Sequence, residues 1–162
     1  MDIRRIKSSD AEGFATLWGE VYQEGLFLRS GPPPIDVISQ VLTKVQNTKI
    51  PQFVALNGMQ VIGSIEAFPG SMCGQELDSV GFLGAQVSKD CRRKGVGRAL
   101  LDTVIQDSKR YGFEELRLTV FQSNLAAQKL YRSFGFEFRG ETNEVLASGE
   151  EEPAYRMNLL LV

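Results

Sequence analysis

The sequence predicts an α/β (α+β) fold around a mixed sheet, and three patterns lead to that prediction. Short alternating apolar runs, which fit strands, are separated by longer amphipathic runs, which fit helices. Asn57 and Gly58 join two of the apolar runs in the manner typical of a hairpin. Near Gly95, an apolar run passes through a turn into helical periodicity. The resulting order of elements, βααβββαβαββ, is that of a domain with a mixed sheet.

The N-terminal residues predict a strand followed by a helix. Residues 1–6 alternate in polarity as a strand does. Ser9, followed three residues later by Glu12, is a capping-box pattern, in which two side chains satisfy free N–H groups at a helix start. We therefore expect a helix over residues 10–23.

A loop and a second helix are predicted next. Residues 25–34 combine glycines, three prolines and apolar side chains. Loops of this kind line ligand sites and pack on the core about equally often, so both interpretations stay open. Apolar residues at helical spacing then predict a helix over residues 35–46.

Residues 53–62 give the clearest hairpin signal. Asn57-Gly58 is expected to form its two-residue turn, because both positions of such a turn need a positive φ. The second strand continues to Phe68 and is broken by Pro69. A further strand over residues 80–87 leads into the turn near Gly95.

The C-terminal half is predicted to contain two helices that end at glycines and three strands. In order, these are helix 95–111 before Gly112, strand 116–121, helix 125–134 before Gly135, and strands 136–139 and 155–160. Ser123 or Asn124 is expected to cap the second of these helices. The last two strands flank a predicted acidic loop that contains Glu141, Glu144, Glu150, Glu151 and Glu152.

The composition limits the classes of function. The 162 residues fit a single domain over positions 1–162 and carry a formal net charge of −2. A pI of about 5.3 argues against a nucleic-acid partner, and no apolar run has membrane length, so no membrane partner is expected. The two cysteines show neither a disulfide framework nor metal spacing, and a reducing cytoplasm is the expected location. Since there is no histidine, Ser-His and Cys-His nucleophile pairs and His-based zinc sites are excluded, and no metal is expected.

The stretch from Arg92 to Leu101 has the features of a phosphate site. A strand–turn–helix junction is expected there, where free backbone N–H groups and the positive end of a helix dipole favour an anion. Gly95 and Gly97 are expected to let the backbone approach a ligand closely. Five cationic side chains crowd the junction: Lys89, Arg92, Arg93, Lys94 and Arg98. Cations in the first turn of a helix are unfavourable by roughly 0.3–1 kcal/mol each, and a bound polyanion removes that cost.

Other nucleotide-binding patterns fit this junction less well. A dinucleotide fingerprint needs a third glycine where Leu100 stands, and an acidic residue at the end of the next strand. A Walker-type loop needs Gly-Lys followed by Ser or Thr, whereas here Lys94 precedes Gly95. An ordinary helix start with a solvated basic turn stays open, as does a nucleotide- or phosphate-binding protein of another fold.

Two signatures in this sequence resemble those of the GNAT N-acetyltransferases. Val87 followed by Arg92-x-x-Gly95-x-Gly97-x-Ala99 resembles the acyl-CoA loop of that family. The second signature is similar to Asn124-x-x-Ala127-x-x-Leu130-Tyr131-x-x-x-Gly135-Phe136. The two signatures stand in the family's order, and the resemblance covers essentially the whole chain. Within the family, the chain resembles bacterial acetyltransferases that act on small molecules or free amino acids.

The resemblance implies a fold and a set of cofactor contacts. The fold is a mostly antiparallel twisted sheet of about seven strands with about four flanking helices, in which strands 83–87 and 116–120 splay apart to admit the thioester of acetyl-CoA. The loop amides hold the CoA pyrophosphate, the strand at Gln86 pairs with the pantetheine arm, and Asn124 reaches the same arm. The implied contacts to acetyl-CoA or coenzyme A are Gln86, Val87, Ser88, Arg92, Arg93, Lys94, Gly95, Val96, Gly97, Arg98, Ala99, Asn124 and Ala127.

Two residues are candidates for the chemistry. Tyr131 is expected to donate its phenol proton to the leaving thiolate, although a tyrosine packed in the core is the commoner use of this residue. Some family members carry a glutamate on the strand before the loop, and Val80–Gly84 holds none. Glu66, on the preceding strand, is the nearest substitute as general base. The equal alternative is that Glu66 lies on a solvent face and has no catalytic role.

The acceptor is expected to be a small-molecule, amino-acid or peptide amine that attacks directly in a ternary complex. Deprotonating a lysine side chain at neutral pH costs about 4–5 kcal/mol, whereas an α-amine costs only about 1 kcal/mol. A free amino acid, a polyamine of lowered pKa or a peptide N-terminus therefore fits better than an ordinary lysine. A non-catalytic module that binds or senses acyl-CoA is the alternative function, and the formation of a homodimer stays open.

Overall fold

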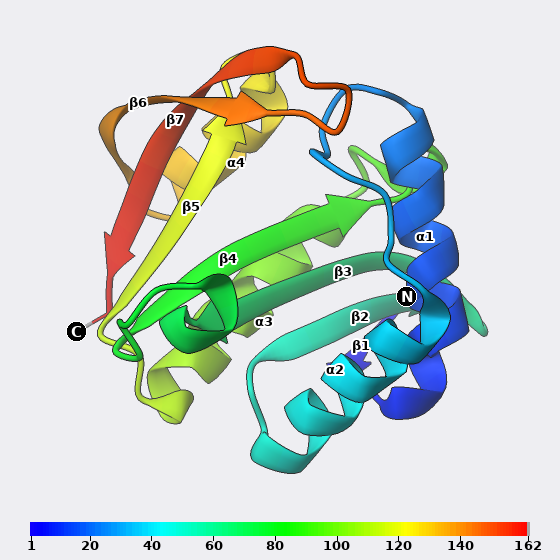
Figure 1. The fold of residues 1–162 in the computed structure, drawn as a ribbon. Helices are drawn as coiled ribbons and strands as arrows, with labels where there is room; N and C mark the ends of the chain where they lie inside the picture. Colours follow the sequence, from blue (N-terminus) through cyan, green and yellow to red (C-terminus); the bar gives the residue numbers. More distant parts are fainter. Residues whose placement is uncertain (162) are drawn as a thin grey trace.

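The computed structural model describes residues 1–161, and the order of its elements confirms the predicted one (Figure 1). Within these residues there are four α-helices: α1 (Ala11–Gln23), α2 (Ile35–Thr48), α3 (Val96–Tyr111) and α4 (Leu125–Ser133). The seven strands are β1 (Asp2–Arg5), β2 (Gln52–Asn57), β3 (Gln60–Pro69), β4 (Val80–Val87), β5 (Glu115–Phe121), β6 (Glu137–Val145) and β7 (Glu151–Leu160). Helix α2 extends two residues beyond its expected end.

All seven strands belong to one sheet, in the order β1-β2-β3-β4-β5-β7-β6. Every neighbouring pair is antiparallel except β4 and β5, which are parallel. These two strands pair only where Val80–Phe82 meet Glu115–Arg117, and they diverge beyond that point (Figure 1). The predicted mixed sheet with a splay at its middle is confirmed, and the splay opens at Leu83 and Leu118.

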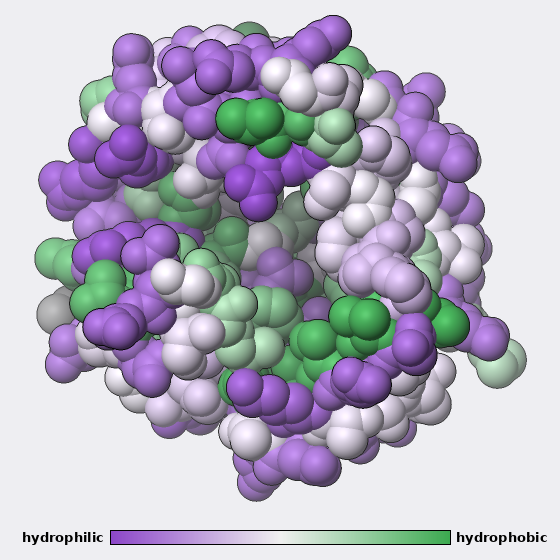
Figure 2. Space-filling view, viewed as in Figure 1, coloured by the Kyte–Doolittle hydropathy of each residue, from purple (hydrophilic) through white to green (hydrophobic). Residues whose placement is uncertain are grey.

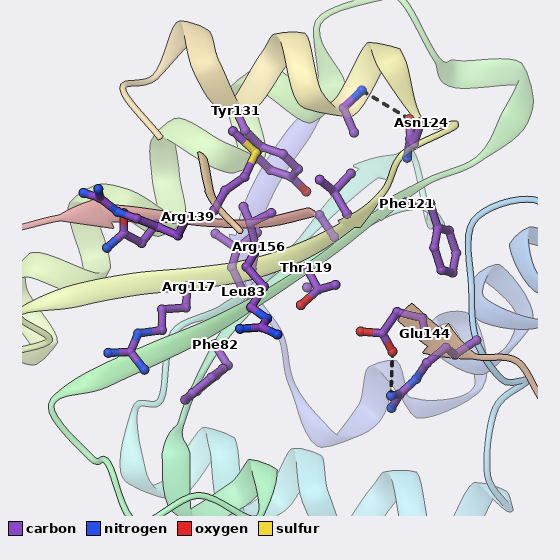
Figure 3. A pocket seen from close by; sticks show the side chains of 18 of the residues that line it. Phe82, Leu83, Arg117, Thr119, Phe121, Asn124, Tyr131, Arg139, Glu144 and Arg156 are labelled. Carbon is purple, nitrogen blue, oxygen red and sulfur yellow. Dashed lines mark hydrogen bonds and ion pairs between the residues drawn. The ribbon is translucent and has the colours of Figure 1, made fainter. Parts of the chain in front are cut away.

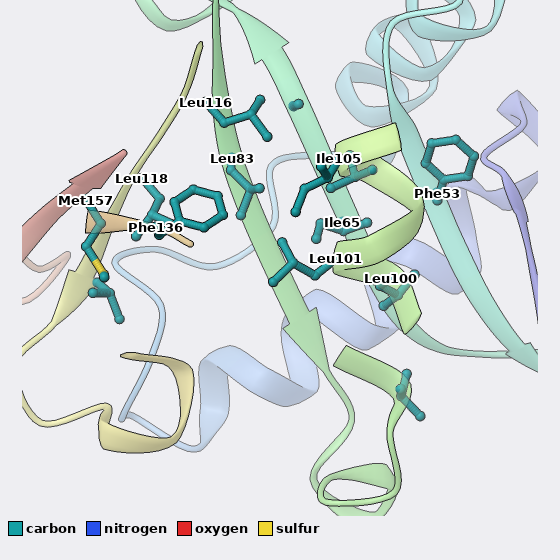
Figure 4. Packing of buried hydrophobic residues seen from close by; sticks show 14 of the residues in the cluster. Phe53, Ile65, Leu83, Leu100, Leu101, Ile105, Leu116, Leu118, Phe136 and Met157 are labelled. Atoms are coloured by element: carbon teal, nitrogen blue, oxygen red, sulfur yellow. The ribbon is translucent and has the colours of Figure 1, made fainter. Parts of the chain in front are cut away.

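Helices cover the first half of the sheet on both faces. On one face, α1 and α2 bury an apolar cluster that includes Leu17, Leu42 and Val54, each at most 1% exposed. On the other face, α3 packs through Leu100 and its neighbours in the same apolar stripe (Figure 4). A fully buried leucine contributes roughly 1.5–3 kcal/mol by burial alone, so these clusters fix the frame that carries the site.

The start of α1 differs from the predicted capping box. No side chain caps the N-terminus of α1, and Ser9 lies in a short 3₁₀ turn that precedes it. Asp10 instead accepts hydrogen bonds from the Lys7 N–H at 2.7 Å and from the Arg4 guanidinium at 2.8 and 2.9 Å. Burial alone would raise the pKa of Asp10, but these bonds outweigh it and lower the pKa. The capping box was wrong because the 3₁₀ turn begins at Ser8, so Ser9 lies inside that turn and not at the N-cap of α1.

The hairpin is present, but its turn lies one residue later than predicted. Asn57 is still paired with Gln60, so Gly58 and Met59 form the two-residue turn. Gly58 has φ +62°, while Asn57 is absent from the residues with positive φ in the described chain. The Asn-Gly pair therefore located the hairpin correctly and misplaced its register.

The predicted acidic loop is largely wrong. Strand β6 runs to Val145 and β7 begins at Glu151, so only residues 146–150 form the loop. Glu144 pairs with Glu152 across the ladder, and Glu141 pairs with Tyr155. Because β6 is the edge of the sheet, polar side chains there stay solvated while the backbone still completes its hydrogen bonds, so their polarity did not indicate a loop.

Candidate active site

A cleft of about 850 Å³ opens where β4 and β5 diverge. Its walls come from β4, β5, β7, β6, α4 with its N-cap residue, the loop between α1 and α2, and Gln75 in the segment before β4. Figure 2 shows the hollow near the centre of this face, with hydrophilic side chains along much of its rim. The loop after α1, whose role the sequence left open, contributes Phe27, Leu28 and Arg29 to the wall. Leu28 also packs on the apolar cluster beneath α1 and α2, so both interpretations of this loop hold.

The loop residues are tied to the far end of the sheet. Arg29 forms an ion pair of 2.9 Å with Glu144 on β6. The Arg29 carbonyl also accepts a hydrogen bond of 2.9 Å from the N–H of Ala147, and the Trp18 indole donates to the Ser30 carbonyl at 2.8 Å. The two contacts of Arg29 join segments more than 110 residues apart and close one end of the cleft, while the Trp18 bond ties the loop to α1.

The edge of β4 facing the splay carries main-chain groups without a strand partner on that side. Pairing with β5 ends at Phe82, so Leu83–Val87 present an open strand edge to the cleft. Gln86 Oε1 is buried without a hydrogen-bond donor among the described residues. Such an orphaned acceptor is uncommon in folded proteins, and a donor on a bound ligand would satisfy it. The Ser88 N–H lies on the other side and donates to the Ile62 carbonyl at 2.8 Å.

The turn before α3 has the backbone shape of an anion site. Arg93 and Gly95 adopt φ +61° and +87°, so two left-handed residues flank the turn. Consecutive peptides in such alternating conformations form concave N–H arrays that suit anions. The first backbone bond of α3 runs from the Ala99 N–H to the Gly95 carbonyl at 3.0 Å, so the N–H groups of residues 96–98 precede the helical ladder. A Cβ built on Gly95 would meet nothing within 4 Å, so the turn is not blocked.

The basic side chains at this turn serve different purposes. Arg92 forms a bidentate pair with Glu24, both distances being 2.6 Å, donates to the Val87 carbonyl at 3.0 Å and lies over the Phe27 ring. Its guanidinium thus holds the end of α1 against the end of β4 and is not grouped with the loop amides. Pairing of Arg92 with Glu24 was missed because the two lie 68 positions apart.

The other cations at the turn are better placed for an anion. Arg93 and Lys94 are exposed at the turn itself. Arg98 is also exposed, and its guanidinium lies over the Phe134 ring at 5.3 Å and donates to Ser133 Oγ at 3.3 Å. Arg93 and Lys94 therefore supply positive charge at the surface of the turn, while the Arg98 guanidinium lies against α4.

Gly95 and Gly97 are glycines for different structural reasons. Gly95 needs its left-handed conformation, which most L residues avoid. A Cβ on Gly97 would point at Leu130 and Val87, 3.4 and 3.9 Å away, which is ordinary van der Waals contact. Gly97 thus faces packed side chains of α4 and β4, and the expected close ligand approach at this position has no support in the packing.

Asn124 and Ala127 lie together at the start of α4. The Asn124 side-chain oxygen accepts a hydrogen bond of 3.2 Å from the Ala127 N–H, which confirms that Asn124 caps this helix. Both residues also line the cleft. Capping and a contact to a ligand in the cleft are therefore compatible in position.

Tyr131 reaches the cleft from the other side of the sheet. It lies on α4 against Phe136, with ring centroids 5.5 Å apart, and Figure 3 shows its hydroxyl directed toward the cleft. Burial, together with the negative charge of Glu66, raises the pKa of Tyr131 to about 12. The phenol thus keeps its proton at neutral pH and is available as a hydrogen-bond donor.

Glu66 lies at the floor of the splay and not on a solvent face. It pairs with Gly84 across β3 and β4, and a Cβ on Gly84 would collide with Oε2 of Glu66. Gly84 lines the cleft, so the missing side chain leaves room for the Glu66 carboxylate beside it. Burial raises the pKa of Glu66 to about 8, within the range of a general base that works near neutral pH.

The sequence interpretation missed the polar face of β5, β7 and β6 in the cleft. Its members are Glu115, Arg117, Thr119, Arg139, Arg156 and Asn158. Arg117 and Thr119 alternate with the buried Leu116 and Leu118, so they lie on the opposite face of the same strand. Two sequence features could have predicted this polar face: the alternation along residues 116–119, and the lack of a fifth amphipathic helix to cover it.

Within the described part of the chain, no group of three or more His, Cys, Asp or Glu side chains is placed to hold a metal ion. Among residues 1–161, no helix is both long and apolar enough to cross a membrane.

Comparison with known proteins places this geometry in a family. The model of the Acetyltransferase (GNAT) family matches residues 26–136, more than half of the chain. N-acetyltransferase family 8 member 3 of Mus musculus is 33% identical over 90 residues, which cover 56% of this chain and 40% of that protein. The ribosomal protein bS18-alanine N-acetyltransferase of Escherichia coli K12 is 42% identical over 60 residues, which cover 37% of this chain and 40% of that protein. The chain thus matches about two fifths of the length of these curated relatives.

Solved structures share the whole fold. An acetyltransferase of the GNAT family from Streptococcus pneumoniae superposes with a TM-score of 0.88 at 21% identity, covering 99% of both chains. A Salmonella typhimurium protein solved with its cofactor acetyl-CoA superposes with a TM-score of 0.87 at 19% identity, covering 100% of this chain and 94% of that chain. These likenesses exclude the nucleotide-binding protein of another fold that the sequence left open. The fold and the family match together show that this chain belongs to the GNAT acetyltransferase family.

Proposed function

We propose that this chain is an acetyl-CoA-dependent N-acetyltransferase, acting as one domain over residues 1–162, that acetylates a primary amine by direct attack in a ternary complex. The observation that carries the proposal is the convergence of Tyr131 and Glu66 on one splay. Tyr131 enters from α4. Glu66, on β3, lies beside Gly84 of β4, which lines the cleft. A proton donor and a proton acceptor thus flank the place where two strands leave an open edge.

The residues that would hold the cofactor fit its chemistry. The free N–H groups of residues 96–98 suit a diphosphate, with Arg93 and Lys94 supplying charge. The open edge of β4 suits the amide groups of a pantetheine arm, which would add to the sheet as a strand does. Gln86, Val87, Asn124 and Ala127 lie along that path, whereas the Ser88 N–H is already bonded to the Ile62 carbonyl on the other side of the strand. Arg92 contributes through the backbone position that Glu24 fixes. When bound, acetyl-CoA supplies the activated acetyl thioester.

Glu66 and Tyr131 divide the proton transfers. Glu66, with a pKa of about 8, accepts the proton that the attacking amine must lose. A phenol of pKa about 12 is too weak to protonate a thiolate of ordinary pKa outright, so Tyr131 first stabilises the leaving sulfur by a hydrogen bond. Once Glu66 is protonated, it no longer raises the pKa of Tyr131, and the phenol becomes a stronger acid at the moment the thiolate forms.

Release of free thiol from acetyl-CoA, measured with a panel of amines, tests the proposal. We expect thiol release that depends on the amine and yields the N-acetylated product, with kcat/KM rising as the pH approaches 8 and Glu66 ionises. Glu66→Gln should lower kcat/KM and leave only the rise that comes from ionisation of the amine itself. Tight binding of acetyl-CoA with no thiol release for any amine would instead favour the non-catalytic acyl-CoA-sensing module.

A further inference from the structure

The acceptor side of the cleft is positively charged, although the chain as a whole is not. Four arginines and two glutamates line the cleft, a formal charge of +2, whereas the chain carries −2. The lining contains no aspartate or lysine among the described residues. Glu66, beside Gly84, adds little negative charge at pH 7 because its pKa is about 8. A concave wall of one sign concentrates its field, so this charge acts on any molecule that enters.

Three of the four arginines already have acidic partners. Arg29 pairs with Glu144 at 2.9 Å. Arg117 pairs with Glu115 at 2.8 Å. On the edge strand, Arg139 pairs with Glu137 at 3.0 Å and donates a hydrogen bond of 2.6 Å to Asn158 Oδ1. Arg29 and Arg117 are held by glutamates of the same wall and Arg139 by a glutamate outside it, so the charge of all three is largely neutralised.

Arg156 is the arginine of the cleft for which no ion pair occurs within residues 1–161. It stands on β7 directly opposite Thr119 on β5, and both are exposed to the cleft. Its neighbours Tyr155 and Met157 point to the other face, where they pack on the main apolar cluster. Figure 3 shows Arg156 close to Thr119, on the same cleft into which the Tyr131 hydroxyl is directed. A guanidinium and a hydroxyl thus lie side by side as free donors.

This pair of donors selects the chemistry of a ligand. A guanidinium binds a carboxylate through two parallel hydrogen bonds, and such charge-assisted bonds are about twice as strong as neutral ones. A polyamine would bring further positive charge beside Arg156, whose charge no ion pair among residues 1–161 compensates. Among the acceptors open on the sequence alone, the wall therefore disfavours polyamines and favours amines that also carry an anion.

We propose that the acceptor is a primary amine bearing a carboxylate, and that Arg156, assisted by Thr119, binds this carboxylate so that the amine faces Glu66 and Tyr131. This inference rests on the proposed acetyl transfer and specifies its substrate class. Arg156 acts as a specificity residue that grips the acceptor and takes no part in proton transfer. Substitution of this residue should therefore change KM for the acceptor and leave the binding of acetyl-CoA alone.

The test compares acceptors that differ only in their anion. Free α-amino acids are assayed for thiol release individually, each beside its carboxamide, its decarboxylated amine and its aminophosphonate analogue. A peptide pair with Glu or Gln as the second residue, and spermine, complete the panel. We expect the carboxylate compounds to exceed their carboxamides at least tenfold in kcat/KM. The aminophosphonates show whether another anion can replace the carboxylate, and the peptide pair shows whether a side-chain carboxylate can do so.

Variants then assign the preference to its residue. Arg156→Gln should raise the acceptor KM at least tenfold for carboxylate compounds, change kcat little and leave the carboxamide KM unaltered. Arg156→Lys should restore part of the loss. Arg110→Gln is the matched control, because Arg110 lies on α3, is 71% exposed and does not line the cleft. Acetyl-CoA affinity should be equal in all four proteins.

The outcomes separate this inference from the proposed function. Acetylation of carboxamides or spermine as efficiently as of carboxylate compounds, or a preference that survives in Arg156→Gln, overturns the inference and leaves the acetyltransferase intact. A fall in acetyl-CoA affinity in Arg156→Gln also overturns it, since the arginine would then serve the cofactor. If no amine releases thiol although acetyl-CoA binds, the proposed function and the inference fail together.

Discussion

Strands β2 and β3 have helices packed on both faces, whereas β5 and β7 have α4 on one face and the cleft on the other. In the first pair, residues 52–55 of β2 and 61–65 of β3 are buried without interruption. In the second pair, buried Leu116, Leu118 and Met157 alternate with Arg117, Thr119 and Arg156. The strands of the first half are therefore buried on both faces, whereas those of the second half bury one face and present polar side chains to the cleft on the other. The difference arises because no helix follows β5 on the cleft side.

The parallel junction of β4 and β5 is the boundary between the halves. Only three residue pairs hold it, from Val80 with Glu115 to Phe82 with Arg117. Every other contact between neighbouring strands is antiparallel. A sheet that changes strand direction at a short contact can diverge there without breaking either half, and that divergence provides the open edge beside Tyr131 and Glu66.

The largest effect is expected for chemistry at the boundary. Tyr131→Phe removes the hydroxyl that faces the cleft and keeps the ring contact with Phe136. We expect kcat to fall about 10²-fold, at the lower end of the usual range for a general acid, with acetyl-CoA affinity nearly unchanged. Steady-state kinetics and calorimetric titration measure the two quantities. Undiminished kcat would remove Tyr131 from the mechanism.

The two halves should also differ in what side-chain truncation costs. Leu100→Ala, in the covered half, deletes a side chain that is 1% exposed and should lower the free energy of unfolding by about 2–5 kcal/mol. Thr119→Ala, on the cleft face, should change it by less than about 0.5 kcal/mol. Urea unfolding measures both. A large cost at Thr119 would mean that the cleft wall is part of the stabilising core.

Stability should depend on pH through the buried carboxyl at the boundary. The pKa of Glu66 rises from an ordinary 4.5 to about 8 on folding, so the folded chain binds a proton that the unfolded chain releases between these values. The stabilisation is complete below pH 4.5 and is lost as the pH rises through 8, at about 1.4 kcal/mol per pH unit inside that window.

Glu66→Gln is the matching control for this dependence, because glutamine resembles the protonated carboxyl and does not ionise. Its unfolding free energy, measured by urea titration from pH 5 to pH 9, should lack the decline seen in the parent. Parallel pH profiles for the two proteins would contradict the prediction, because they would mean that folding leaves the pKa of Glu66 unchanged.

A last pair of predictions concerns the turn before α3. Gly95→Ala forces a Cβ into a left-handed conformation and should cost about 1–2 kcal/mol, while weakening acetyl-CoA binding by distorting the N–H array. Gly97→Ala places its Cβ at contact distance from Leu130 and should be stabilising by about 0.5–1 kcal/mol, with little change in affinity. Thermal unfolding and CoA titration measure both. Loss of CoA binding in Gly97→Ala would restore the role of close ligand approach at that position.

Local patterns were reliable where one segment determines its own structure. The sequence predicted the helices from their periodicity, the end of α3 at Gly112, whose φ is +108°, and the cap at Asn124. It also placed the glycine turn before α3, since the glycine and the helix start are neighbours in the chain. Its errors were the position of the hairpin turn and the acidic loop, where pairing with another strand decided the outcome, and the capping box, where a 3₁₀ turn over Ser8–Asp10 precedes α1.

The sequence by itself determined the elements, their order, and the two signatures that carry the family resemblance and include Tyr131. Only the tertiary structure decided that Arg92 is committed to Glu24, that Gly84 makes room for Glu66, and that Arg156 stands without an acidic partner among the described residues. The physical reason is range. Periodicity, capping and turn conformation depend on residues a few positions apart, whereas burial, charge pairing and pKa depend on neighbours that the folded sheet brings together.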